Sequence, residues 1–501
     1  MSNFKLSPSN LTKMPTFQKL LTKSKYINGL QCPKLLWIAV NQKERIVEID
    51  QVRFDEGILV GREAKKLYPD GIDISTENFK NNLEDSILLL KKGKPLFEAA
   101  FQSERTYSRA DILEPSKECW NIIEVKSSTK VKDEHIQDVA FQKYCYEKVG
   151  LKINKCYLMH LNSKYIRKGK INLEELFIKE DISKKVEEEI KHIPKRVKEM
   201  LEIIDGKEPN VKIGNFCNIP RECPIMEECW KFLPENHVFE LYRGNKQAME
   251  LFEKGILAIK DIPEDYELED KHRIQRYCVK NNKPHVNKKE LTNFIEKLKY
   301  PLYFLDFETY QSAIPIYDDL SPYQQIPFQF SLHVVDEDNK KEHFSFIAES
   351  NKDPRKEFLK ELKKVLGKKG SIIVYNQSFE QGRIKELAEL FPKNKKWAES
   401  VTKRMVDLLI PFRNFYYYDC KQKGSCSIKH VLPALTKKTY EGMEIDNGGL
   451  ASIRYLYIIH GDKHGKKASA EEVKKVREDL EKYCGLDTEA MVDVLDVLRK
   501  V

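Results

Sequence analysis

Two carboxylates separated by one residue, Asp306 and Glu308, follow an apolar run that begins after Pro301. On a β-strand, residues i and i+2 lie on the same face, so both carboxylates would point in one direction. Two buried carboxylates on one face repel each other unless cations neutralise them. Oxygen ligands of this kind suit Mg²⁺ or Mn²⁺, so the pair predicts a divalent metal site. The alternative is an ordinary strand whose polar face is in contact with water.

Residues further along the chain could complete such a site. Residues 372–376 (IIVYN) are predicted to form a second buried strand, and Glu380 lies in the helical pattern that follows it. Tyr483 and Asp487 are four residues apart and would share one helical face. We expect this last helix to open at Tyr483 and to run to residue 498.

These three motifs, in this order, resemble those of the DnaQ-like 3′–5′ exonucleases that carry a tyrosine in the third motif. Asp306 and Glu308 match the first motif, residues 376–380 (NQSFE) match the second, and residues 483–487 (YCGLD) match the third. Glu380 departs from the pattern, because the family usually has aspartate there. The longer side chain could still reach a metal ion, with altered geometry.

The resemblance implies a ribonuclease-H-like α/β fold for residues 300–501. It also implies that four carboxylates, Asp306, Glu308, Glu380 and Asp487, hold two Mg²⁺ or Mn²⁺ ions. In the family, one ion activates water and the other stabilises the leaving oxygen, while the tyrosine helps to position the water.

A second group of charged residues lies in the first third of the chain, where three strand-like runs precede a helical pattern. The runs cover residues 95–102, 106–113 and 120–126, and the helix is predicted for residues 133–149. Asp111 falls on the second run. Glu124 and Lys126 fall on the third, on one face of the strand. A glutamate and a lysine at this spacing are common on surface strands, so the pair alone defines no site.

The order of these elements resembles the RecB-like branch of the PD-(D/E)XK nucleases. The matching residues are Asp111 on the second core strand, Glu124 and Lys126 in the acidic-x-lysine motif, and Gln142 and Tyr146 in the helix signature of the branch. In that chemistry, carboxylates hold Mg²⁺ and the lysine orients the attacking water. Glu98 corresponds to an additional metal ligand near the N-terminus, where family members often have histidine.

Three cysteines, Cys217, Cys223 and Cys229, are separated by gaps of five residues. Three soft thiolates close together indicate zinc or an iron–sulfur cluster, and the C-x₂-C pairs common in zinc sites are absent here. Cys32, which precedes Pro33, is the candidate fourth ligand. The pattern resembles iron–sulfur RecB-like nucleases, which implies a 4Fe-4S cluster that fastens the N-terminal helix to the end of the nuclease domain. The alternative is a set of buried, reduced cysteines.

The remaining cysteines are expected to be ordinary core residues. They are Cys119, Cys145, Cys156, Cys278, Cys420, Cys426 and Cys484. The 501-residue chain is 33% charged and 41% hydrophobic, and no apolar run is long enough to span a membrane. The first 24 residues lack the apolar segment of a signal peptide. We therefore expect a cytoplasmic protein without a membrane partner, whose cysteines are reduced or metal-bound.

The sequence predicts three parts: a RecB-like nuclease domain (residues 1–235), a helical spacer (236–299) and a DnaQ-like domain (300–501). This arrangement resembles an uncharacterised bacterial family that joins such halves. The net charge of +9 is compatible with nucleic acid. The expected function is a metal-dependent nuclease that acts on nucleic acid, with DNA favoured over RNA. The alternatives are a nucleic-acid-binding protein whose nuclease folds are inactive, and an RNA-processing exonuclease.

Overall fold

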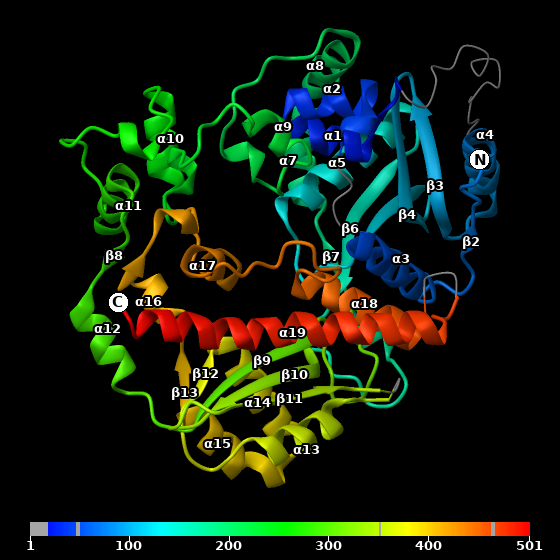
Figure 1. Ribbon diagram of the computed structural model, residues 1–501. Coiled ribbons are helices and arrows are strands. Elements are labelled where there is room, and N and C mark those ends of the chain that lie inside the picture. Colours follow the sequence, from blue (N-terminus) through cyan, green and yellow to red (C-terminus); the bar gives the residue numbers. More distant parts are fainter. Residues whose placement is uncertain (1–18, 47–50, 350–351, 462–465) are drawn as a thin grey trace. The chain divides into compact units, whose positions relative to one another are not determined.

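The computed structural model describes residues 19–46, 51–349, 352–461 and 466–501 (Figure 1). The chain divides into two compact units, which are described in turn. The first comprises Met1–Phe232 and Ser312–Tyr323, and the second comprises Leu233–Gln311 and Gln324–Val501. Each unit combines a β-sheet with helices, so the predicted mixed α/β class is confirmed. Among the described helices, none is both long and apolar enough to cross a membrane.

The first unit is built on a seven-stranded sheet in the order β2-β3-β4-β5-β6-β7, with β1 paired to β4. The strands are β1 (Leu21–Thr22), β2 (Ile72–Asp73), β3 (Leu96–Ser103), β4 (Thr106–Ser116), β5 (Cys119–Lys126), β6 (Ile153–Leu161) and β7 (Phe177–Asp181). Strands β3, β4 and β5 are antiparallel neighbours, whereas β5 and β6 are parallel. The three strands predicted before residue 127 are confirmed as β3, β4 and β5.

Helices cover both faces of this sheet. They are α1 (Lys23–Gln31), α2 (Pro33–Asn41), α3 (Gln51–Lys65), α4 (Phe79–Leu89), α5 (Asp133–Lys148), α6 (Leu173–Leu176), α7 (Ser183–Glu189), α8 (Ile193–Asp205) and α9 (Met226–Trp230). Alternate residues of β5 enter two different cores. Ile123 packs in the same core as Val60 of α3, and Ile122 packs in the same core as Val139 of α5. Burial of both faces explains why two consecutive residues of β5, Ile122 and Ile123, are apolar.

The second unit contains a five-stranded sheet in the order β11-β10-β9-β12-β13 and a two-stranded sheet of β14 and β8. The strands are β8 (His285–Val286), β9 (Leu302–Tyr310), β10 (Ile326–Val335), β11 (Lys341–Ile347), β12 (Ile372–Val374), β13 (Met405–Asp407) and β14 (Tyr417–Tyr418). Strands β9, β10 and β11 are antiparallel, whereas β12 runs parallel to both β9 and β13.

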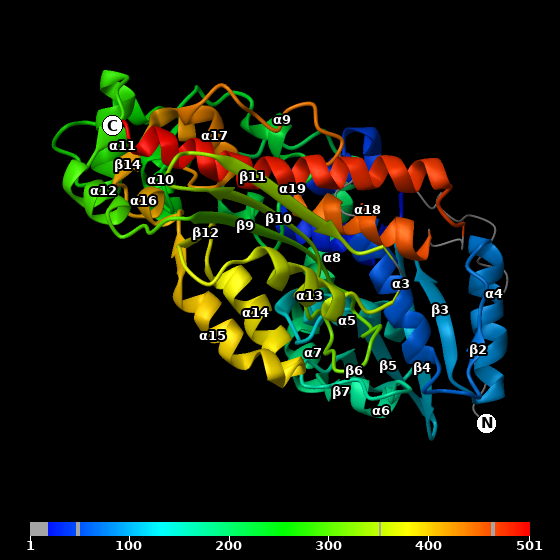
Figure 2. The same cartoon turned by 60° about the horizontal axis from the view of Figure 1, so that its bottom comes forward.

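Ten α-helices complete the described part of the second unit. They are α10 (Asn245–Glu253), α11 (Asp270–Asn281), α12 (Lys288–Ile295), α13 (Arg355–Val365), α14 (Ser378–Leu390), α15 (Lys395–Lys403), α16 (Ile410–Arg413), α17 (Ile428–Leu435), α18 (Gly448–His460) and α19 (Ala470–Leu498). Figures 1 and 2 show α19 along one face of the larger sheet and α13, α14 and α15 on the other. The predicted spacer, residues 236–299, is largely helical and is part of this unit.

The last helix is longer than the sequence motif suggests. We expected a helix that opens at Tyr483, but α19 begins at Ala470, so this prediction is wrong. Ser469 forms a capping box with Glu472: its hydroxyl accepts a bond from the Glu472 amide, and the Glu472 carboxylate accepts one from the Ser469 amide. Tyr483 therefore lies in the middle of a continuous helix, where the flanking turns on both sides hold it in place.

Candidate functional site

Strand β9 positions Asp306 and Glu308 on the face of the sheet that α19 covers. Their neighbours Leu305 and Phe307 point the other way, into the apolar core against α13. The register between β9 and β10 shifts at Pro327 and Gln329, which places a bulge beside Glu308. Ligand atoms of Asp306, Glu308 and Cys484 all lie within 4.8 Å of one another. The strand thus brings the two carboxylates together, as the spacing predicted.

Glu380 enters the site from the first turn of α14. Asn376 adopts a left-handed conformation (φ 81°) that turns the chain from β12 into this helix. The Asp407 carboxylate fixes the turn by accepting a hydrogen bond from the Asn376 amide at 3.0 Å. Glu380 is only 1% exposed, and its Oε2 atom has no hydrogen-bond partner in the part of the chain that the structure describes. An unpartnered carboxylate oxygen at this depth is costly and is suited to a cation.

Asp487 reaches the same site from the middle of α19. It is buried, and Tyr440 donates a hydrogen bond from its hydroxyl to Asp487 Oδ1 at 2.6 Å. Burial raises the pKa of Asp487 to about 6, although the Tyr440 hydrogen bond opposes the shift. Burial, reinforced by Asp487, raises the pKa of Asp306 well above its usual range. Burial raises the pKa of Glu308 as well, with Asp306 as the next cause.

Glu380 belongs to the same electrostatic cluster. Burial raises its pKa well above the usual range, and the negative charge of Asp306 adds to the shift. Asp306, Glu308, Glu380 and Asp487 therefore come together from β9, α14 and α19. Each of the four carboxyl groups is harder to ionise than in water, because burial and like charges oppose ionisation.

The Tyr483 ring lies beside these carboxylates, and the side chains of Tyr440 and Lys429 lie near it. Burial raises the pKa of the Tyr483 hydroxyl, and Asp487 is the next cause. The Nζ atom of Lys429 lies 5.5 Å from the centre of the Tyr483 ring and 5.6 Å from the centre of the Tyr440 ring. Its positive charge lowers the pKa of Glu308 and Asp487 in opposition to their burial. Lys429 thus neutralises part of the negative charge.

A second cluster of charged side chains lies on the sheet of the first unit. The pairing of β4 with β5 aligns Ile112 with Ile123, which places Asp111 beside Glu124. The Asp111 carboxylate accepts a hydrogen bond from the Val125 amide at 2.7 Å. Burial raises the pKa of Asp111 to about 7, and the charge of Glu124 contributes.

Glu124 is 1% exposed and has three side-chain donors. Lys126 and Lys23 donate to its Oε1 atom at 2.7 and 2.6 Å, and Gln142 donates to Oε2 at 2.6 Å. Burial alone would raise the pKa of Glu124, but the two lysines outweigh burial and hold it well below its usual range. Four predicted residues, Asp111, Glu124, Lys126 and Gln142, therefore lie in one cluster.

Two members of this cluster, Lys23 and Asp138, were not predicted from the sequence. Lys23, the first residue of α1, bonds Glu124, and Asp138 of α5 accepts a bond from Lys126 at 2.6 Å. Asp138 lies one helical turn before Gln142, a spacing that could have identified it. Lys23 is about a hundred residues away in sequence, and nothing in its local pattern indicates this position.

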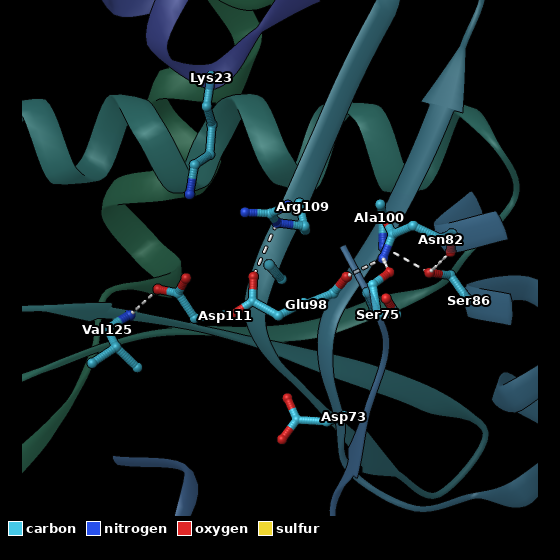
Figure 3. A network of polar contacts seen from close by, with 12 residues as sticks. Lys23, Asp73, Ser75, Asn82, Ser86, Glu98, Ala100, Arg109, Asp111 and Val125 are labelled. Carbon is cyan, nitrogen blue, oxygen red and sulfur yellow. Dashed lines mark hydrogen bonds and ion pairs between the residues drawn. The ribbon is translucent and has the colours of Figure 1, made fainter. Parts of the chain in front are cut away.

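Two further residues predicted for this site, Tyr146 and Glu98, contact groups other than the four clustered residues named above. The Tyr146 hydroxyl donates to the Ala99 carbonyl at 2.6 Å and accepts from the Ala110 amide at 2.8 Å, so it ties β3 to β4. Glu98, with a left-handed φ of 58°, is paired with Arg109 at 2.9 Å and with Lys65 at 3.2 Å. Figure 3 shows Glu98 turned toward Arg109, and Asp111 beside the Val125 backbone. The Tyr146 hydroxyl is therefore held by two backbone groups, and Glu98 is paired with two cationic side chains.

The four predicted cysteine ligands also come together in the first unit. Cys32 lies between α1 and α2, Cys217 ends a 3₁₀ turn (Asn215–Cys217), and Cys229 is in α9. Burial raises the pKa of Cys223 to about 11, and the other three thiols contribute, in the order Cys32, Cys217 and Cys229. The four thiols are thus close enough to influence one another.

Main-chain contacts support this cysteine cluster. The Gln31 side-chain amide donates to the carbonyls of Phe216 and Arg221 at 2.9 and 2.8 Å, joining the end of α1 to the loop that carries the other cysteines. Backbone amides of Leu35 and Lys34 donate to the Cys32 sulfur. Burial nevertheless raises the pKa of the Cys32 thiol, and these two backbone hydrogen bonds only oppose that rise.

Comparison with known proteins gives matches of undetermined function. Residues 303–427 match a family described as a domain of unknown function, DUF2779. The matched stretch includes β9 from its second residue onward and all of α14, but not α19. An uncharacterized protein of Mycoplasma genitalium is 28% identical over 241 residues, and its homologue in Mycoplasma pneumoniae is 26% identical over 225 residues. These alignments cover 42% and 40% of this chain, and 34% and 32% of the two relatives. The chain therefore spans about a third of the length of the curated relatives it matches.

Proposed function

We propose that the protein is a metal-dependent nuclease whose second unit is a DnaQ-like 3′–5′ exonuclease with a ribonuclease-H-like fold. The observation that carries the proposal is the convergence of four buried carboxylates from β9, α14 and α19 on one site. Tyr483 lies beside them on α19, as the resemblance to this class implies. A set of like charges with this separation in sequence is difficult to explain as ordinary core packing.

The donor set fits divalent metal ions. Oxygen ligands are offered by four carboxylates, those of Asp306, Glu308, Glu380 and Asp487. The single positive charge of Lys429 is too small to balance them. These residues would hold two Mg²⁺ or Mn²⁺ ions, which would supply an activated water and stabilise the leaving oxygen. Within the chain, Tyr483 would orient the water, while Tyr440 holds Asp487 in place through its 2.6 Å hydrogen bond.

The first unit supports a second cleavage site of the PD-(D/E)XK type. Asp111 and Glu124 would be the metal ligands, and Lys126 would orient the attacking water. Lys23 and Gln142 hold Glu124 from its two oxygens, so both would position a ligand. We further propose that Cys32, Cys217, Cys223 and Cys229 hold a 4Fe-4S cluster, since four soft thiolates in one place suit iron–sulfur chemistry.

The proposal is tested with the full-length protein and end-labelled substrates. Single- and double-stranded DNA and RNA of matched sequence are incubated with Mn²⁺ or with chelator. We expect mononucleotides to be released from the 3′ end of DNA, no release with chelator, and no release when the 3′ end is blocked. Binding without cleavage of any substrate would favour the nucleic-acid-binding alternative, and a preference for RNA would favour the RNA-processing one.

Lys126→Ala should strongly reduce the activity of the N-terminal site. We expect cleavage that persists on 3′-blocked DNA to fall by about 10²–10⁴-fold, the usual loss for a positioned acid–base group. Asp111 and Glu124 remain in place, so metal binding should be weakened less than turnover. Lys152→Ala, at an exposed lysine before β6, is the control and should cleave at the wild-type rate. Unchanged cleavage by Lys126→Ala would contradict the assignment.

Cations should stabilise the protein more at neutral than at acidic pH. The pKa of Asp487 is raised to about 6 and that of Asp111 to about 7, so both groups favour folding when protonated. Their contribution to the free energy of unfolding is fully present below the ordinary pKa of aspartate, near 3.8. It is lost as the pH rises through the raised pKa values. Without divalent cations, this contribution should decline from about pH 4 to pH 7.

Divalent cations bind the ionised carboxylates and should reverse that loss. Saturating Mn²⁺ at about 100 times its dissociation constant should add about 2.7 kcal/mol, or about 5–10 °C in melting temperature, near pH 7.5. The increase should be much smaller near pH 5, where protons compete with the metal. Thermal melting at both pH values, with Mn²⁺ or chelator, measures this. An equal shift at the two pH values would contradict ligation by these groups.

A further inference from the structure

Cys484, expected to be an ordinary core residue, lies inside the carboxylate cluster of the second unit. Its side chain is fully buried, and its Sγ atom donates a hydrogen bond to Asp306 Oδ2 at 3.4 Å. A ligand atom of Glu308 completes a group of three within 4.8 Å. We propose that Asp306, Glu308 and Cys484 form a binding site for a thiophilic divalent cation of the Zn²⁺ class. This inference rests on the metal site of the proposed exonuclease and concerns which cations it accepts.

The geometry suits a tetrahedral cation. Zinc binds thiolate sulfur at about 2.3 Å and carboxylate oxygen at about 2.0–2.2 Å, so a sulfur and an oxygen on one ion are separated by about 3.5 Å. The 3.4 Å between Cys484 Sγ and Asp306 Oδ2 is close to this separation. A cation at this position would replace the thiol proton that now lies between Cys484 Sγ and Asp306 Oδ2.

A second observation also indicates a ligand at this site. Glu380, which is 1% exposed, has an oxygen atom without a hydrogen-bond partner among the described residues. Its carboxylate lies near the cluster, because its negative charge raises the pKa of Glu308 and the charge of Asp306 raises its own pKa. Glu380 is therefore available as a fourth ligand. One thiolate and three carboxylates give a mixed soft and hard donor set that zinc accepts and that magnesium does not need.

Two kinds of cation would then use the site differently. Mg²⁺ and Mn²⁺ take oxygen ligands, and Cys484 keeps its proton and its bond to Asp306. With Zn²⁺, the Sγ–H bond breaks, the proton is released to solvent, and a metal–sulfur bond forms without any change of oxidation state. Thiolate ligation would draw the ion toward α19 and away from octahedral geometry. Zn²⁺ should consequently displace the productive ions and inhibit trimming of the 3′ end.

Binding is tested with Co²⁺ or Cd²⁺, whose thiolate complexes absorb in the near ultraviolet. The full-length wild type, Cys484→Ser and Asp306→Asn are each titrated with the cation. The three proteins are prepared with the same metal content in the four-cysteine cluster, so that this cluster contributes equally to each titration. Cys278→Ser removes another fully buried thiol of the second unit and is the matched control. Wild type and Cys278→Ser should each bind one more equivalent of the cation than Cys484→Ser does. That additional equivalent should produce a thiolate absorption band. Asp306→Asn should weaken that equivalent by at least about tenfold.

A chemical measurement on the wild type avoids dependence on the folding of a variant. Cd²⁺ should protect one thiol from alkylation during partial unfolding, and mass spectrometry should locate that protection at Cys484. A thiolate band that persists in Cys484→Ser, or no protection at Cys484, would overturn the inference. The metal readouts are independent of cleavage. Cys484-dependent binding without trimming would count against the exonuclease alone, whereas trimming without such binding would count against this inference alone.

Discussion

Asp306→Asn should reduce 3′-end trimming by at least about 10³-fold. The substitution keeps the size of the side chain but removes one negative charge from the centre of the cluster. The charge of Asp306 raises the pKa of Glu308 and Glu380, and ligand atoms of Asp306, Glu308 and Cys484 lie within 4.8 Å of one another, so a cation bound by Asp306 would lie beside other ligands. The measurement is single-turnover release of labelled 3′ nucleotides with saturating Mn²⁺, in a protein that also carries Lys126→Ala to silence the N-terminal site.

Companion variants separate ligand loss from general damage. Tyr483→Phe keeps all four carboxylates and loses one hydroxyl, so it should slow trimming less than Asp306→Asn does. Glu380→Asp introduces the aspartate that DnaQ-like exonucleases usually have at this position, and it should be tolerated if Glu380 binds metal. Asp338→Asn, at an exposed turn residue, is the matched charge control and should trim normally. Trimming by Asp306→Asn at the control rate would show that the C-terminal unit is not the exonuclease.

Much of this site could be predicted because its signals are local. The i, i+2 carboxylates on a strand and the i, i+4 pair on a helix each have the periodicity of their element. The start of α19 was missed although its signal is also local. Ser469 and Glu472 form a capping box, but the third motif drew the predicted boundary to Tyr483, thirteen residues too late.

Residues that depend on tertiary contacts could not be predicted in the same way. Tyr440 lies in the connection between α17 and α18 and meets Asp487 across 47 residues. Lys23 meets Glu124 across 101 residues. Neither has a spacing that links it to its partner. Cys484 is a different case, because it lies within the third motif, but that motif assigns no role to its position, and free cysteine is often a small core residue.

The boundaries of the parts were also set by tertiary contacts. The segment Ser312–Tyr323 follows β9 in sequence yet belongs to the first unit, and residues 236–299 belong to the second. Buried Ala313 and Ile314 share an apolar core with Val60 of α3, which explains the assignment of the segment. Composition alone shows that a stretch is helical or apolar, but it does not show which core the stretch completes.

Cys32→Ser should remove most of the iron from the protein and destabilise the first unit. Cys32 connects α1 to α2, while the other three cysteines lie about 185–197 residues further along the chain, so the cluster would join distant segments. Loss of a direct ligand should cost at least about 3 kcal/mol, or about 6–12 °C in the melting temperature of the first unit. Iron and sulfide content, visible absorption and melting of anaerobically purified protein measure both effects.

Tryptophan fluorescence can assign the melting transition to a unit. Trp37, Trp120 and Trp230 lie in the first unit, and Trp397 lies in the second. Cys119→Ser, at a half-buried thiol outside the cluster, is the matched control and should keep its iron. Stoichiometric zinc without iron would reject the iron–sulfur cluster but retain a metal link, and unchanged metal content in Cys32→Ser would contradict both.

The same variant tests whether the cluster supports the N-terminal site. Lys23 begins the helix that ends beside Cys32, and its Nζ atom bonds Glu124 at 2.6 Å. If the cluster fixes α1, its loss should release Lys23 and lower cleavage of 3′-blocked DNA. Trimming of free 3′ ends depends on β9, α14 and α19 and should continue at the wild-type rate. A parallel loss of both activities in Cys32→Ser would contradict the independence of the two sites.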